Sequence, residues 1–210
     1  LTFSSAPSSI IAIGTVVSAD RSGKAKTTER MKVLEINDSL GSSNGLNQEL
    51  GGFGTRVEDS SISLGCADVF KIKAIFESTD SSSPQIPYFE YTNLLGDIAE
   101  DEVIEGVSSG SRGRIVSTTG NRIYYIPVED DKFTDGEDMT SPNATFKIVS
   151  GGLVEGATNI TDNFDLDDGQ RDQFYDYSRI IRKAGVAAPT HKILVIFDRF
   201  FTSNGTNPYT

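Results

Sequence analysis

The sequence is poor in the side chains that carry most protein chemistry. Its 210 residues include one cysteine, one histidine and no tryptophan. A single cysteine cannot close an internal disulfide, and one cysteine with one histidine cannot supply the four ligands of a structural zinc site. No uninterrupted apolar run approaches the ~20 residues that a membrane helix needs. We therefore expect no disulfide framework, no zinc centre and no membrane insertion.

Basic side chains are also few. The chain carries 19 lysines and arginines against 30 aspartates and glutamates, so its net charge is −11 at pH 7. An excess of negative charge repels phosphate backbones and anionic lipid surfaces. This charge balance argues against a nucleic acid partner.

What the sequence does contain is a strong period of two. Residues 67–76 alternate apolar and polar side chains, as a strand with one exposed face does. Residues 192–197 are apolar at every central position, which is typical of a strand covered on both faces. Further predicted strands span residues 10–17, 31–36, 88–91, 113–117, 122–126 and 145–149. The pattern predicts a mainly β protein.

The spacing of these strands predicts two units. Residues 95–140 contain short strands and tight turns, which favour a small β-roll or SH3-like module with a thin core. We expect this module to be inserted into a β-sandwich-like domain made of residues 1–94 and 141–210, whose two halves share a sheet. A string of small β units is the alternative architecture.

One short helix is predicted near residues 169–179. Phe174, Tyr177, Ser178 and Ile181 recur at helical spacing, and acidic residues precede basic ones along the segment. The aromatic and β-branched residues of the same segment also favour a strand, so a change to strand near residue 180 is the second interpretation.

Candidate catalytic and metal sites are weak. Asp165 and Asp167 stand in an acidic run that could bind calcium, but the expected glycine and twelfth-position glutamate of a calcium loop are missing. Cys66 lacks a base that the sequence places beside it, and His191 fits a structural role at the start of a strand. We expect no catalytic set, no metal and no cofactor, and therefore not an enzyme.

The stretch 162–180 resembles a signature of large virion structural proteins from contractile-tailed bacteriophages, particularly cyanophages and related marine phages. The resemblance rests on one short run of this stretch: Gly169, Gln170, Arg171, Asp172, Phe174, Tyr175 and Asp176. Residues 62–72 and the small β unit at 110–136 are similar to recurring parts of the same baseplate and tail proteins.

This resemblance implies a non-enzymatic module of a phage baseplate or tail, located in the virion. Its partners would be other virion structural proteins, in hetero- and homo-oligomeric contacts. Within it, Gly169 would permit a tight start to the helix, Arg171 would pair with Asp172 or Asp176, and Phe174 with Tyr177 would anchor the segment in the core. The alternative is a host-surface adhesin module binding carbohydrate or protein through loops 41–54 and 80–84. The chain ends suggest a piece of a longer or processed polypeptide.

Overall fold

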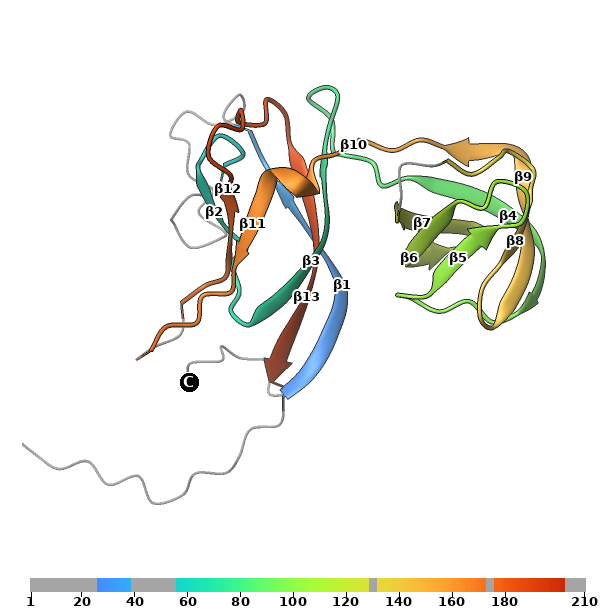
Figure 1. The fold of residues 1–210 in the computed structure, drawn as a ribbon, viewed down its shortest axis with the longest axis horizontal. Helices are drawn as coiled ribbons and strands as arrows, with labels where there is room; N and C mark the ends of the chain where they lie inside the picture. The colour runs from blue at the N-terminus through green and yellow to red at the C-terminus, as the bar shows by residue number, and fades with distance from the viewer. Residues whose placement is uncertain (1–25, 39–55, 129–131, 173–175, 203–210) are drawn as a thin grey trace, which may run out of the picture.

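The computed structural model describes residues 26–38, 56–128, 132–172 and 176–202, and it shows a mainly β protein. Two modules lie side by side: a sandwich of two sheets and a closed barrel (Figure 1). The prediction of a mainly β chain is confirmed. The predicted strand at residues 10–17 and the loop at 41–54 lie outside the described residues.

The larger sheet of the sandwich is antiparallel, with the order β1-β13-β3-β10. Its strands are β1 (Lys26–Ile36), β13 (Ile193–Thr202), β3 (Val69–Glu77) and β10 (Thr158–Asn159). A register shift between Glu29 and Lys32 interrupts the pairing of β1 with β13, and Met31 at this bulge has a φ of 50°. The strand therefore bends there, as bulged strands do.

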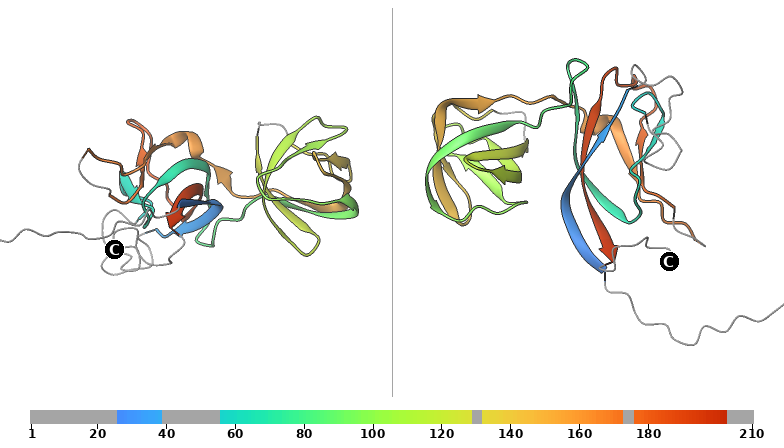
Figure 2. Two further views of the ribbon diagram at one scale, coloured as in Figure 1. Left: turned by 90° about the horizontal axis from the view of Figure 1, so that it is seen from below. Right: turned by 180° about the vertical axis from the view of Figure 1, so that it is seen from behind.

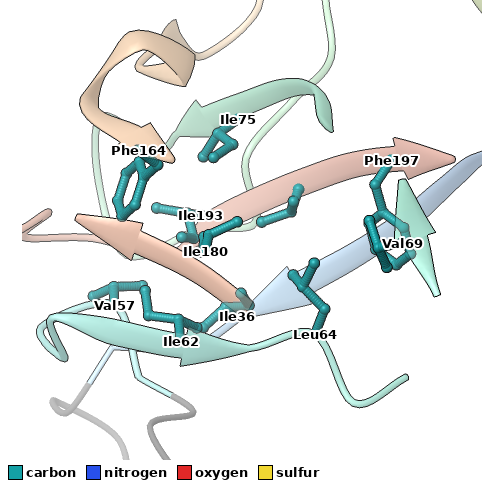
Figure 3. Close-up of a cluster of buried hydrophobic side chains, with 11 residues drawn as sticks. Ile36, Val57, Ile62, Leu64, Val69, Ile75, Phe164, Ile180, Ile193 and Phe197 are labelled. Carbon is teal, nitrogen blue, oxygen red and sulfur yellow. The ribbon is translucent and has the colours of Figure 1, made fainter. Parts of the chain in front are cut away.

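The smaller sheet has the order β11-β12-β2 and also pairs antiparallel. Its strands are β2 (Ser61–Ser63), β11 (Phe164–Asp167) and β12 (Arg179–Arg182). A short 3₁₀ turn, η3 (Thr161–Asn163), leads into β11. Apolar side chains of both sheets fill the space between them (Figure 3): Ile36, Val57, Ile62, Leu64, Val69, Ile75, Phe164, Ile180, Ile193, Val195 and Phe197.

Six strands close the barrel in the order β4-β7-β6-β5-β8-β9. They are β4 (Tyr88–Gly96), β5 (Val103–Gly106), β6 (Arg112–Thr119), β7 (Arg122–Pro127), β8 (Asp138–Thr140) and β9 (Ala144–Val154). Phe89 lies at the centre of its core, with the rings of Tyr125, Phe133 and Phe146 at centroid distances of 5.5, 5.8 and 6.0 Å. The interior is filled by side chains, as in other small barrels.

The inserted module is larger than its expected span of 95–140. Strands β4 and β9 belong to the barrel, so residues 88–94 and 144–154 lie in the inserted module instead of the sandwich. The insertion leaves the sandwich after β3 and returns at β10, and the backbone N–H of Ala157 bonds to the carbonyl of Gln85, 2.7 Å away. The strands of a barrel must close a cycle, and the long β4–β9 pairing provides that closure.

The predicted helix near 169–179 is wrong for the described part of that segment. Residues 168–172 and 176–178 form a loop that joins β11 to β12, and β12 begins at Arg179. The second interpretation, a strand near residue 180, agrees with the structure. Of the described residues, none forms a helix that is long and apolar enough to cross a membrane.

A third apolar cluster joins the two modules, and we call it the joint cluster. Its members come from the outer face of the larger sheet and from the barrel strands β6 and β7: Met31, Ala74, Phe76, Leu194 and Ile196 with Val116 and Ile126. Figure 2 shows the barrel on this side of the larger sheet, opposite the smaller sheet. The larger sheet is therefore covered on both faces, which explains why residues 193–197 are apolar throughout.

Candidate functional site

The residues of the signature form the loop between β11 and β12. Gly169 has a φ of +78°, and the backbone N–H of Asp176 donates to its carbonyl oxygen at 2.8 Å. A Cβ atom at position 169 would lie 2.4 Å from the carbonyl oxygen of Asp176. Both the left-handed backbone and the close approach of the two loop limbs require glycine here.

Arg171 holds the first limb of this loop. Its Nη1 and Nη2 donate to Oδ1 and Oδ2 of Asp167 at 2.9 and 2.7 Å, and Asp167 also accepts the backbone N–H of Gly169. The hydrogen bond from Arg171 lowers the pKa of the Asp167 carboxyl, despite its partial burial. Sequence reasoning named Asp172 and Asp176 as partners of Arg171 and missed Asp167. A two-point contact of this kind fixes geometry as well as charge.

Ser178 ties the second limb to both sheets. It is fully buried, and its Oγ donates to the carbonyl of Asp168 at 2.8 Å and accepts the backbone N–H of Val69 at 3.1 Å. Its backbone bonds to Cys66 and Leu64 as well. From the sequence, Ser178 was predicted only as one position on the apolar face of a helix. Helical spacing gives no indication of hydrogen bonds that connect two sheets.

The other residues of the signature differ in their exposure and contacts. Gln170 and Asp172 are exposed in the loop, and Asp176 pairs with Arg179 at 2.6 Å. Phe174 and Tyr175 lie outside the described residues. Tyr177 is 39% exposed, so the expectation that it anchors the segment in the core is wrong.

The two calcium candidates both contact cations of the protein. Asp165 and Asp167 lie on strand β11, where Asp165 is exposed with Lys183 Nζ at 3.7 Å, and Asp167 binds Arg171. Within the described ranges, no group of three or more histidine, cysteine, aspartate or glutamate side chains is arranged to hold a metal ion.

Cys66 and His191 have structural surroundings. Burial raises the pKa of the Cys66 thiol, and the nearby Arg199 only partly opposes this effect. A raised thiol pKa disfavours the nucleophilic thiolate. The backbone N–H of His191 donates to Glu77 Oε1 at 3.3 Å, while its ring Nδ1 is buried with no hydrogen-bond partner among the described atoms.

A group of five charged side chains connects the two modules, and we call it the joint ion network: Arg30, Lys73, Asp101, Arg114 and Asp198. Lys73 Nζ lies 2.7 Å from Asp101 Oδ1, across the joint, and 3.1 Å from Asp198 Oδ2, within the larger sheet. The Lys73 side chain is 6% exposed, and Asp198 also accepts the backbone N–H of Met31 at the bulge of β1.

Asp101 is the carboxylate that the barrel contributes to this network, beside Arg114 of β6. Burial raises the pKa of its carboxyl, but Lys73, Arg30 and Arg114 outweigh that effect, and the net pKa lies below the usual 3.8. Asp101 therefore stays ionised at neutral pH. Its backbone has a φ of 68°, and its carbonyl accepts a hydrogen bond from Arg114 at 2.7 Å.

Within the barrel, Glu137 organises two loops. Its carboxylate accepts the backbone N–H and hydroxyl of Ser108, the backbone N–H and hydroxyl of Ser109, and the backbone N–H of Thr134. Burial raises the pKa of Glu137, but these hydrogen bonds more than offset it and hold the pKa below 4.5. Gly106 leaves room for the Glu137 carboxylate, since a Cβ at position 106 would lie 2.5 Å from Glu137 Oε1.

Comparison with protein-family models, with curated proteins and with solved structures found no match.

Proposed function

We propose that this chain is a non-enzymatic structural module of a tailed-phage virion, part of a baseplate or tail protein that makes assembly contacts. The proposal starts from the similarity of residues 162–180 to a signature of such proteins. The observation that carries the proposal is the structural role of three residues in this stretch. Asp167, Gly169 and Arg171 hold the shape of the β11–β12 loop. Residues whose bonds fix a loop fit a scaffold better than a reacting centre.

The connection between the modules supports the same role. A buried apolar cluster and the ion pair between the buried Lys73 and Asp101 cross the joint, so the sandwich and barrel have a defined mutual orientation. A structural protein that holds its neighbours in place within an assembly needs domains with a fixed mutual orientation. A flexible linker between two independent binding modules would not need the buried Lys73–Asp101 contact.

The test is to locate the chain in purified phage particles. Mass spectrometry of particles should find it in stoichiometric amounts, and gold-labelled antibodies should bind at the baseplate or tail body. Label confined to exposed fibre tips, together with glycan binding by the purified chain, would favour the adhesin alternative. Absence from the particles would refute the proposal.

A further inference from the structure

Two exposed phenylalanine rings lie on the outer face of the larger sheet. Phe70 of β3 and Phe200 of β13 are 42% and 40% exposed, and their ring centroids are 4.5 Å apart. Phe200 follows Leu194 and Ile196 of the joint cluster at even intervals along β13, so its side chain points to the face that also carries the barrel. We call the two rings the aromatic patch.

The aromatic patch lies at the end of the sheet where the chain enters β1 and leaves β13. Phe200 is paired with Thr28, two positions from the pairing of Lys26 with Thr202. The ends of β1 and β13 extend past the part of the sheet that the barrel covers (Figure 1), and both rings remain exposed. Isolated exposed apolar residues are ordinary, but two rings in contact form an apolar surface that favours cover by another segment.

The segment that leads into this end of the sheet has a distinctive composition. Residues 1–19 contain no aspartate, glutamate, lysine, arginine or histidine, whereas charged residues make up 23% of the whole chain. Within this segment, residues 10–17 are predicted as a strand and include three isoleucines and two valines. Apolar side chains gain free energy when they leave water and pack on an apolar surface. This composition therefore suits a segment that packs against protein.

The position of Lys26 brings this segment close to the aromatic patch. Lys26 Nζ binds Asp68 Oδ2 at 2.9 Å, and the carbonyl of Asp68 accepts the backbone N–H of Phe200 at 3.0 Å. Residue 17 is nine positions before Lys26. Nine extended residues span about 30 Å, which is enough for residues 10–17 to fold back over the patch.

Two other segments outside the described residues fit the aromatic patch less well. Residues 203–210 follow the same end of the sheet, but their one large apolar side chain is Tyr209. Residues 39–55 follow the opposite end of β1, where Ile36 is paired with Ile193. Composition and position together therefore favour residues 10–17 as the occupant.

We propose that residues 10–17 dock on the aromatic patch of the same chain, with their isoleucine and valine side chains against Phe70 and Phe200. The segment would thereby cover the part of the outer face that the barrel leaves exposed. This inference is independent of the proposed virion role, because it concerns contacts within one chain.

The test is nuclear magnetic resonance of the full chain with labelled isoleucine methyl groups. Nuclear Overhauser contacts should connect methyl groups of residues 10–17 with the rings of Phe70 and Phe200. Phe200→Ser should abolish these contacts and move the methyl resonances of the segment to unfolded-chain positions. The matched control is Phe201→Ser, which changes a 38% exposed phenylalanine on the opposite face of the same strand and should leave the contacts in place. Unchanged methyl resonances of the buried Ile180 and Ile193 show that each variant is folded.

A second variant tests the segment and leaves the sheet unaltered. Ile13→Asp should release the methyl groups of Ile10 and Ile11 from the rings, because burying an unpaired charge against them is costly. Ser5→Asp adds the same charge outside the apolar run and should have no such effect.

Three results would overturn the proposal. The first is the absence of contacts between the segment and the two rings, and the second is an equal loss of contacts in Phe200→Ser and Phe201→Ser. The third comes from a mixed sample, in which some chains carry labelled isoleucine and the others labelled phenylalanine. Contacts between the two labels there would assign the patch to the segment of a second copy.

Discussion

At the scale of single residues, buried carboxylates bring distant loops together. Glu137 connects the turn at Ser108 and Ser109 to the loop at Thr134 through five hydrogen bonds. Its side chain therefore adds hydrogen bonds between these two loops, next to strand β8, which has only three residues. Hydrogen bonds to a charged acceptor contribute more than neutral ones, so the ionised form matters for stability.

Replacing Glu137 by glutamine should lower the free energy of unfolding by about 2 kcal/mol at neutral pH, since the amide nitrogen cannot accept these bonds. The pKa of Glu137 is lowered in the folded state, so its stabilising effect is present above the unfolded-state pKa and is lost as pH falls through the folded-state pKa. Urea unfolding at neutral and acid pH measures this. Glu105→Gln, at an exposed position of β5, is the control and should change little. Indistinguishable behaviour of the two variants would contradict this role.

Gly169 allows a second test at the same scale. Gly169→Ala should destabilise the chain by about 1–3 kcal/mol more than Gly185→Ala. Both glycines have a φ near +80°, but a Cβ at Gly185 meets nothing within 4 Å, whereas one at Gly169 meets the carbonyl of Asp176. Comparing the thermal unfolding of the two variants separates the loss of stability caused by the close approach from the loss caused by the backbone conformation. If both lose the same stability, the close approach at Gly169 is unimportant.

At the scale of elements, some strands could be predicted from the sequence and the β11–β12 segment could not. The residue patterns of β3 and β13 reflect which faces of these strands are buried, and both strands were predicted close to their observed positions. The segment after Gly169 also shows helical spacing, and intrinsic preference was ambiguous there. Pairing of β12 with both β11 and β2 decided the outcome, and this long-range pairing leaves no local signal.

The joint could be predicted only in part. The apolar character of residues 192–197 indicated that this strand is covered on both faces. The partners Lys73 and Asp101 lie 28 positions apart in the chain, and Lys73 and Asp198 are still farther apart. No spacing rule joins such residues, so the ion network could not be derived from the sequence.

Removing the barrel carboxylate from this network should weaken the joint. Asp101→Asn should cost about 3 kcal/mol at neutral pH, because it leaves the buried Lys73 with one carboxylate and reduces the pairing of Arg30 and Arg114. The folded-state pKa of Asp101 is lowered, so this contribution is present above the unfolded-state pKa and disappears as pH falls through the folded-state value. Denaturant unfolding over this range tests the prediction. The exposed Asp97 provides the control, and an equal effect of Asp97→Asn would contradict it.

At the scale of the whole molecule, each module has its own core and the joint cluster couples them. The barrel core uses only residues of the insertion, and the chain leaves and re-enters the sandwich at neighbouring points. A closed barrel has no open edge through which to pair with other chains. These features favour a module that folds as a unit.

A fragment of residues 85–157 should therefore fold by itself and unfold cooperatively. It should be less stable than the same barrel in the whole chain, because Val116 and Ile126 lose their cover in the joint cluster. Circular dichroism and hydrogen exchange of the fragment check this expectation. A fragment without protected amides would show that the sandwich is required for the barrel to fold.

The central claim is that this two-module unit is a part built into a virion. The most direct measurement is a cryo-electron microscopy reconstruction of the phage particles in which the proposal places the chain. The account predicts density for both modules in the baseplate or tail body, in their observed mutual orientation. Density at a free fibre tip, or no density for the chain in the particle, would contradict it.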